Sequence, residues 1–252
     1  SLGYFTSSWA FGMLVAPPIG GRIVQTASFT ILFLTSLVVG ITATMFAVLG
    51  LKTLREEKTQ NDMSRSKANT MVVLLPVFLV AVALSTALGV AFNIFPAYLN
   101  NLGMDPFQIG VIFAALGLTR AITFSQTSYA TKIGENLSMM IGLIILAVSL
   151  FATSTATMFT EIIAVVAFLG VGMGILGPLS VSVTSKMATK EKTGAAIGAT
   201  ESFYGLGWGL GPLMGGVVAE TLGPTTPYMV TAILIVACMI PLARTMTRRS
   251  AI

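Results

Sequence analysis

Eight apolar runs, most of them long enough to cross a lipid bilayer, divide this chain of 252 residues. A helix needs about 20 apolar residues to span the hydrocarbon layer, whereas the strands of a membrane barrel have about 10 residues and alternate in polarity. The runs here are continuous and rich in Leu, Ala, Gly and Met, so they predict an all-α, polytopic transmembrane helical bundle. The expected spans are residues 2–23, 29–51, 71–98, 107–128, 137–152, 158–183, 194–218 and 227–242.

The composition supports a membrane protein and excludes several other classes. Only 9% of the residues are charged, against about 25% in a soluble domain. The chain has no His and a single cysteine, Cys238. We therefore expect no metal site, no internal disulfide, no cofactor and no enzymatic activity. No basic patch interleaved with aromatic residues is visible, which argues against nucleic acid as a partner.

The basic residues gather in alternate loops between the expected spans. Of the 14 Lys and Arg residues, 12 fall on one side of the bundle. Cytoplasmic loops carry an excess of Lys and Arg, so we expect a multi-pass protein of the plasma membrane with segment 52–70 and the C-terminus in the cytoplasm. The polar segment 52–70 is expected to be a solvated linker between two spans in residues 1–51 and six in residues 71–252.

A pattern of glycine and proline occurs twice, at an offset of 195 residues. Small residues four apart let helix backbones approach closely in lipid, and each proline removes a backbone hydrogen bond and can kink its helix. Ordinary helix packing would explain one such stripe, but its repetition favours a role in conformational change. The matching residues are Gly12 and Gly207, Pro17 and Pro212, Gly20 and Gly215, and Gly21 and Gly216, while Ala16 corresponds to Gly211.

With this repeat the sequence resembles the major facilitator superfamily, whose fifth and eleventh helices often carry the motif G-x8-G-x3-G-P-x2-G-G. Residues 198–216 match the motif fully, and residues 3–21 match it with one substitution. Residues 95–120 look similar to the family's seventh-to-eighth helix region, and residues 170–178 to its tenth helix. The resemblance implies a six-helix C-terminal half, preceded by the last two helices of an N-terminal half whose first four helices are missing.

The resemblance also implies a function, namely secondary active transport of a small solute by alternating access through a cavity between the halves. In this family the fifth-helix motif is associated with antiporters, which favours proton-coupled efflux of a drug or metabolite. The alternatives are uptake of a sugar or organic anion by symport or uniport, or a membrane interaction module without transport if the chain is the complete protein. The lipid bilayer, protons and a small-molecule substrate are the expected partners.

Charged and aromatic residues inside the spans are the candidates for solute binding. Arg120 and Glu201 each lie roughly 10–12 Å from the nearer span end, at about 1.5 Å per residue. A charge at that depth usually faces a water-filled cavity or a partner. Tyr204 and Trp208 follow Glu201 at i+3 and i+7 on one helix face, and an acid beside two aromatic rings suits an amphipathic or cationic solute. A structural ion pair, snorkelling or ordinary aromatic packing would explain the same residues.

Glu201 is also the candidate for proton coupling. It is the only acid well inside a span, and intramembrane acids often serve in proton relays. Asn93 and Gln126 are two further polar residues inside the expected spans, and we include them among the candidates for binding.

Residues 172–177 satisfy the pattern G-x-G-x-x-G, which in soluble proteins can indicate a dinucleotide site. Such a site needs a strand before the glycines and a helix after them, whereas this run lies inside an expected span. We therefore predict close helix packing by Gly170, Gly174 and Gly177, with a bend at Pro178.

Overall fold

The protein is a bundle of α-helices in the computed structural model, which describes residues 2–51, 68–126, 132–188 and 192–249. No strand occurs within those ranges, so the predicted fold class is confirmed. In chain order the helices are α1 (Leu2–Thr26), α2 (Phe29–Leu51), α3 (Ala68–Asn93), α4 (Phe95–Asn101), α5 (Pro106–Ser125), α7 (Glu135–Thr153), α8 (Phe159–Met187), α9 (Thr193–Leu222) and α10 (Thr226–Arg249).

Six spans in the described ranges are long and apolar enough to cross a membrane, one of them formed by α3 together with α4. α1 and α9 are not among the six, although they have 25 and 30 residues. Their many Gly, Ser, Thr and Pro residues lower their mean hydropathy. These two helices are the ones that carry the repeated glycine and proline pattern, whose small residues allow close packing between helices.

Two differences between the helix bounds and the expected spans concern the linker and the third span. Most of the expected linker 52–70 lies outside the described residues, but residues 68–70 belong to the first turn of α3 and not to the linker. The long third span is divided at Ile94 into α3 and α4. The division has a local cause, because Pro96 near the start of α4 has no N–H group to continue the hydrogen-bond ladder of α3.

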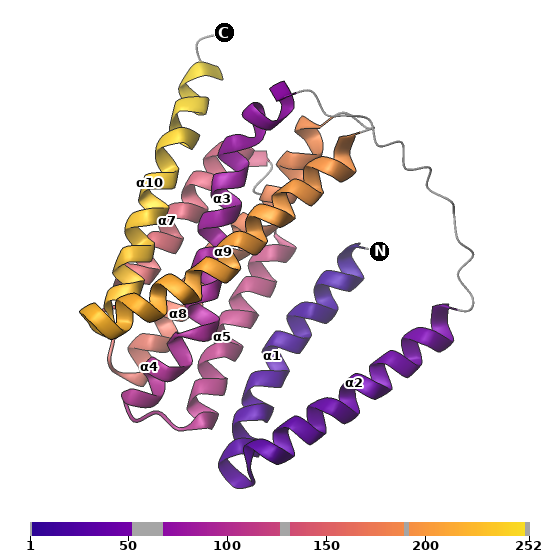
Figure 1. Cartoon of the computed structure of the whole chain (residues 1–252), viewed down its shortest axis with the longest axis vertical. Coiled ribbons are helices and arrows are strands. Elements are labelled where there is room, and N and C mark those ends of the chain that lie inside the picture. Colours follow the sequence, from indigo (N-terminus) through magenta and orange to yellow (C-terminus); the bar gives the residue numbers. More distant parts are fainter. Residues whose placement is uncertain (1, 52–67, 127–131, 189–191, 250–252) are drawn as a thin grey trace.

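Two parts can be distinguished in the arrangement of the helices (Figure 1). α3, α5, α7, α8, α9 and α10 pack into a bundle whose buried core is formed largely by Leu, Val, Ala and Met side chains. α1 lies along α5, and α2 diverges from the bundle and contacts only α1 among the described helices. The described side chains of α2 from Phe29 onward are therefore mostly exposed, and most of them are apolar.

Glycines bring the backbones of α1 and α5 into direct contact. A Cβ atom added at Gly110 of α5 would lie 2.8 Å from the Cα of Pro18 and closer still to the carbonyl oxygen of Pro17. One added at Gly21 of α1 would lie 2.8 Å from the carbonyl carbon of Pro106. These distances leave no room for a side chain, so the first copy of the repeat is what holds α1 against α5.

The second copy of the repeat does the same between α9 and α3. A Cβ atom added at Gly207 would lie 2.6 Å from the carbonyl oxygen of Val82, and one at Gly211 would lie 2.7 Å from that of Thr86. On the opposite side of this contact, Gly89 of α3 leaves room for the ring of Pro212. Each copy of the repeat thus joins its helix to a neighbour through backbone contact.

Candidate functional site

Arg120 is one of the few buried polar side chains of the bundle, with 9% of its surface exposed. It lies on α5 at the point where α8 approaches most closely. A Cβ atom at Gly174 would lie 2.8 Å from the carbonyl oxygen of Arg120, and one at Gly170 would lie 2.5 Å from that of Leu116. Gly170 and Gly174 therefore bring α8 against the backbone that carries this arginine, and the close helix packing predicted for these two glycines is confirmed.

The other glycines of this run have different surroundings. Gly172 faces α7, where an added Cβ atom would lie 3.1 Å from the carbonyl oxygen of Gly142. Gly177 has only the ring of Phe124 nearby, at 3.9 Å, so the predicted close approach at this residue was wrong. α8 is thus packed between two helices by glycines on opposite faces, Gly170 and Gly174 toward α5 and Gly172 toward α7.

Tyr204 connects the arginine to the acid of α9. The guanidinium of Arg120 lies within electrostatic range of the phenol of Tyr204, which is half-buried. Glu201, three residues earlier on α9, lies within electrostatic range of the same phenol. Glu201 is exposed, so its carboxylate lies at the open side of α9 while the arginine lies on the inner side. The phenol of Tyr204 therefore interacts with groups of opposite charge.

Aromatic rings from three helices extend this site along α9. The ring of Trp208, 40% exposed, lies 5.8 Å from that of Phe92 on α3. The Phe92 ring lies 5.3 Å from the ring of Phe113 on α5. Such tilted rings pack through their edges and faces and leave the outer face of the indole open. The predicted common face of Glu201, Tyr204 and Trp208 is present on α9, with the acid and the indole at its exposed side.

The two amide candidates lie apart from this cluster. Asn93 is exposed at the last residue of α3, and its Nδ2 donates a hydrogen bond to the carbonyl oxygen of Gly89 at 2.8 Å. Gln126 is exposed at the C-cap of α5, outside the helix, so its expected place inside a span was wrong. The helix ends earlier than the apolar pattern because residues after Ser125 are more polar.

The residues of the repeated motif fall into two groups. Pro17, Gly21, Gly207, Gly211, Pro212 and Gly215 make close contacts with a neighbouring helix. Gly12 and Gly216 have open space within 4 Å of an added Cβ atom, and Gly20 meets only a leucine side chain at 3.4 Å, at ordinary contact distance. One face of each repeat is thus packed in the described chain, and the adjacent face is open.

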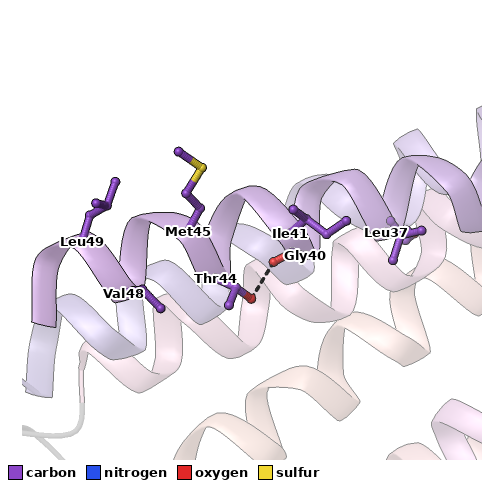
Figure 2. A pocket seen from close by; sticks show the side chains of 8 residues that line it. Leu37, Gly40, Ile41, Thr44, Met45, Val48 and Leu49 are labelled. Atoms are coloured by element: carbon purple, nitrogen blue, oxygen red, sulfur yellow. Dashed lines mark hydrogen bonds between the residues drawn. The ribbon is translucent and has the colours of Figure 1, made fainter.

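A hollow along α2 does not belong to this site (Figure 2). All its lining residues come from one helix, and they are mostly apolar. The hydroxyl of Thr44 donates to the carbonyl oxygen of Gly40 at 2.8 Å, within the same helix. This surface therefore presents little free hydrogen-bonding capacity to a solute, and it is the kind of surface that lipid or another helix covers.

Two buried threonines near Glu201 were not among the sequence candidates. Oγ1 of Thr184 on α8 and Oγ1 of Thr200 on α9 lie 3.0 Å apart. Nearer the end of α8, Nζ of Lys186 forms an ion pair with Glu135 of α7 at 2.5 Å. A spacing of four residues between Ser180 and Thr184, on the helix that carries the glycine stripe, is the signal that could have indicated an inward-facing polar row.

Comparisons with known proteins point to the same family that the sequence resembles. The sequence profile of the Major Facilitator Superfamily matches residues 1–129 and 77–251. An uncharacterized MFS-type transporter of Methanocaldococcus jannaschii is 26% identical over 169 residues, which cover 66% of this chain and 42% of that protein. The quinolone resistance protein NorA of Staphylococcus aureus is 27% identical over 135 residues, which cover 53% of this chain and 34% of NorA. The chain thus spans less than half the length of these relatives.

Proposed function

Since this chain belongs to the major facilitator superfamily, we propose that it is part of a secondary active transporter that exports an amphipathic, cationic solute in exchange for protons. The observation that carries this proposal is the exposed face of α9. An acid, Glu201, and an indole, Trp208, are both exposed there, with Tyr204 between them. A carboxylate attracts a cation, and an aromatic face binds both its charge and its apolar body.

Two further observations support export. The similarity to NorA, whose name refers to quinolone resistance, favours solutes of drug-like size. The glycine and proline repeat of α1, associated in the family with antiporters, makes direct backbone contact with α5, the helix that carries Arg120. A change in the α1–α5 contact would therefore act directly on the helix that holds the arginine.

We assign the coupling role to Glu201. A carboxylate in a membrane span can bind a proton on one side and release it on the other. If the carboxylate binds either a proton or the cationic solute, each displaces the other, and this competition is sufficient for exchange. Tyr204 lies within electrostatic range of both this acid and Arg120, so protonation of Glu201 would change the charge balance near a buried cation.

The proposal includes the plasma membrane as the location, with the basic loops in the cytoplasm. It also includes further helices of the transporter. The open face of α9 at Gly216 and the exposed apolar side chains of α2 would pack against them or against lipid.

One observation favours the alternative of organic-anion uptake. Arg120 is a buried cation held between α5, α8 and α9, and a guanidinium is a good partner for a carboxylate or phosphate. Under this alternative an anionic solute would bind to the guanidinium of Arg120.

The experiment is flux of ethidium, a cationic fluorescent dye, into proteoliposomes with an imposed pH gradient. We expect the parent protein to accumulate the dye against its gradient and Glu201→Gln to lose accumulation. The variant should still bind the dye through its aromatic rings, but more weakly, because the attracting carboxylate is gone. Glu220→Gln is the matched control, because Glu220 is an exposed acid near the other end of α9. Undiminished accumulation by Glu201→Gln would exclude the coupling role, and transport of an organic anion but not ethidium would establish the alternative.

A further inference from the structure

The first half of α9 is joined to α8 by a pair of threonines. Both side chains are buried, with Thr184 at 0% and Thr200 at 3% exposure, and their hydroxyl oxygens lie 3.0 Å apart. Oγ1 of Thr184 also lies 2.7 Å from the carbonyl oxygen of Ser180, and Oγ1 of Thr200 lies 3.0 Å from that of Ala196. Three hydrogen bonds are therefore within reach of the two hydroxyl groups.

Each threonine hydroxyl has one proton to donate, so only two of the three hydrogen bonds can form at once. With the helices together, one threonine donates to the other, which in turn donates to the carbonyl of its own helix. With the helices apart, each threonine donates to the carbonyl one turn earlier. Neither arrangement leaves a buried donor unpaired, which would be the costly outcome in an apolar interior. The contact between α8 and α9 can thus form and break without leaving a buried hydroxyl group unpaired.

The pair lies next to the residue to which we assign proton coupling. Thr200 immediately precedes Glu201, and successive residues of a helix are separated by about 100° around its axis. Phe203 follows Thr200 at i+3 on the same side of α9, and its ring stacks on that of Phe78 from α3 at 4.7 Å. Thr200 and Phe203 thus hold one side of α9 against α8 and α3, and Glu201 lies on the side that is left exposed.

We propose that Thr184 and Thr200 are positioning residues, whose mutual hydrogen bond holds the start of α9 against α8 in one conformation and breaks in another. The break allows α9 to move and changes the access of Glu201 to water. The contact is suited to this role because it is weak and reversible, whereas the glycine contacts between α9 and α3 involve backbone against backbone. This inference rests on the proposed transport function.

The test measures alkylation of an Ala196→Cys variant in a Cys238→Ser background, because Ala196 is buried one turn before Thr200. We expect Thr184→Val and Thr200→Val each to raise the alkylation rate about threefold, the scale of one interhelical hydroxyl bond in a membrane. The double variant should match the single ones, since both remove the same contact. Thr184→Ser should restore the parent rate. Thr153→Val is the control, because that buried hydroxyl donates within its own helix, to the carbonyl oxygen of Ser149.

Transport of ethidium by the same variants provides the second measurement. We expect Thr184→Val to change the apparent affinity for the dye about threefold and Thr184→Ser to restore it. An unchanged alkylation rate in Thr184→Val, or additive effects in the double variant, would overturn the positioning role even if the parent transports the dye. If alkylation responds as expected but the parent moves no ethidium, the threonine contact is supported and the proposed transport function fails.

Discussion

Replacement of Gly207 by alanine tests whether backbone contact between α9 and α3 determines the stability of the bundle. An added Cβ atom would lie 2.6 Å from the carbonyl oxygen of Val82, whereas ordinary van der Waals contact begins at 3.4 Å. The two helices must therefore separate locally by about 0.8 Å, which forfeits a quarter to a half of the dispersion energy of each atom pair in the contact. Nearby Gly209, on the same helix, has open space around it.

The comparison of Gly207→Ala with Gly209→Ala cancels the effect of helix propensity. Alanine is favoured over glycine in a helix interior by up to about 1 kcal/mol, and this gain is common to both variants. Overpacking of a close contact typically costs about 1–3 kcal/mol. We therefore expect the free energy of unfolding of Gly207→Ala to be lower than that of Gly209→Ala by about 1–3 kcal/mol. For a chain of this size that difference corresponds to roughly 2–12 °C in Tm.

Thermal unfolding can be followed through Cys238, the only cysteine of the chain and half-buried in α10. A thiol-reactive dye reports the temperature at which the detergent-solubilised bundle opens, and neither substitution alters the reporter. Gly209→Ala should unfold at or above the temperature of the parent. Equal unfolding temperatures for the two alanine variants would refute the argument that the Gly207 contact carries part of the stability.

Three other predictions follow from single side chains. Tyr228→Phe should raise the unfolding temperature by removing a buried hydroxyl that has no hydrogen-bond partner in the described structure, a group that costs about 1–3 kcal/mol; a lowered temperature would contradict this. Arg120→Ala should impair transport or expression and Arg120→Lys should restore it only in part, because a point charge does not replace a planar guanidinium; full activity of the alanine variant would exclude a role in the site. Ile133→Cys, at an exposed residue beside Lys132, should resist an impermeant thiol reagent on intact cells in a Cys238→Ser background; labelling from outside would reverse the orientation.

The part of the site that lies on a single helix could be predicted from the sequence. Spacing on one helix requires no tertiary information, so the common face of Glu201, Tyr204 and Trp208 could be read directly. The proximity of Arg120 and Tyr204 could not be predicted, because these residues are on helices far apart in the chain and equal depth in the membrane does not make two side chains neighbours. The threonine pair was inaccessible for the same reason, since threonine is common in apolar helices and its partner is chosen by packing.

The sequence by itself determined the fold class and the number of long helices. In lipid every backbone polar group must find a partner within the protein, which leaves helices and closed barrels as the spanning structures. Continuous apolar runs of about 20 residues, without the alternating polarity of barrel strands, then indicate helices. The glycine and proline repeat likewise identified the helices that pack most closely. Only the tertiary structure decided which face of each repeat is used: Gly21 contacts α5 while its counterpart Gly216 is open, and Gly215 contacts α3 while its counterpart Gly20 makes only ordinary contact. The two copies pack through different faces because a glycine stripe permits close approach by any helix. Which helix packs against it is determined by the connectivity and packing of the whole bundle.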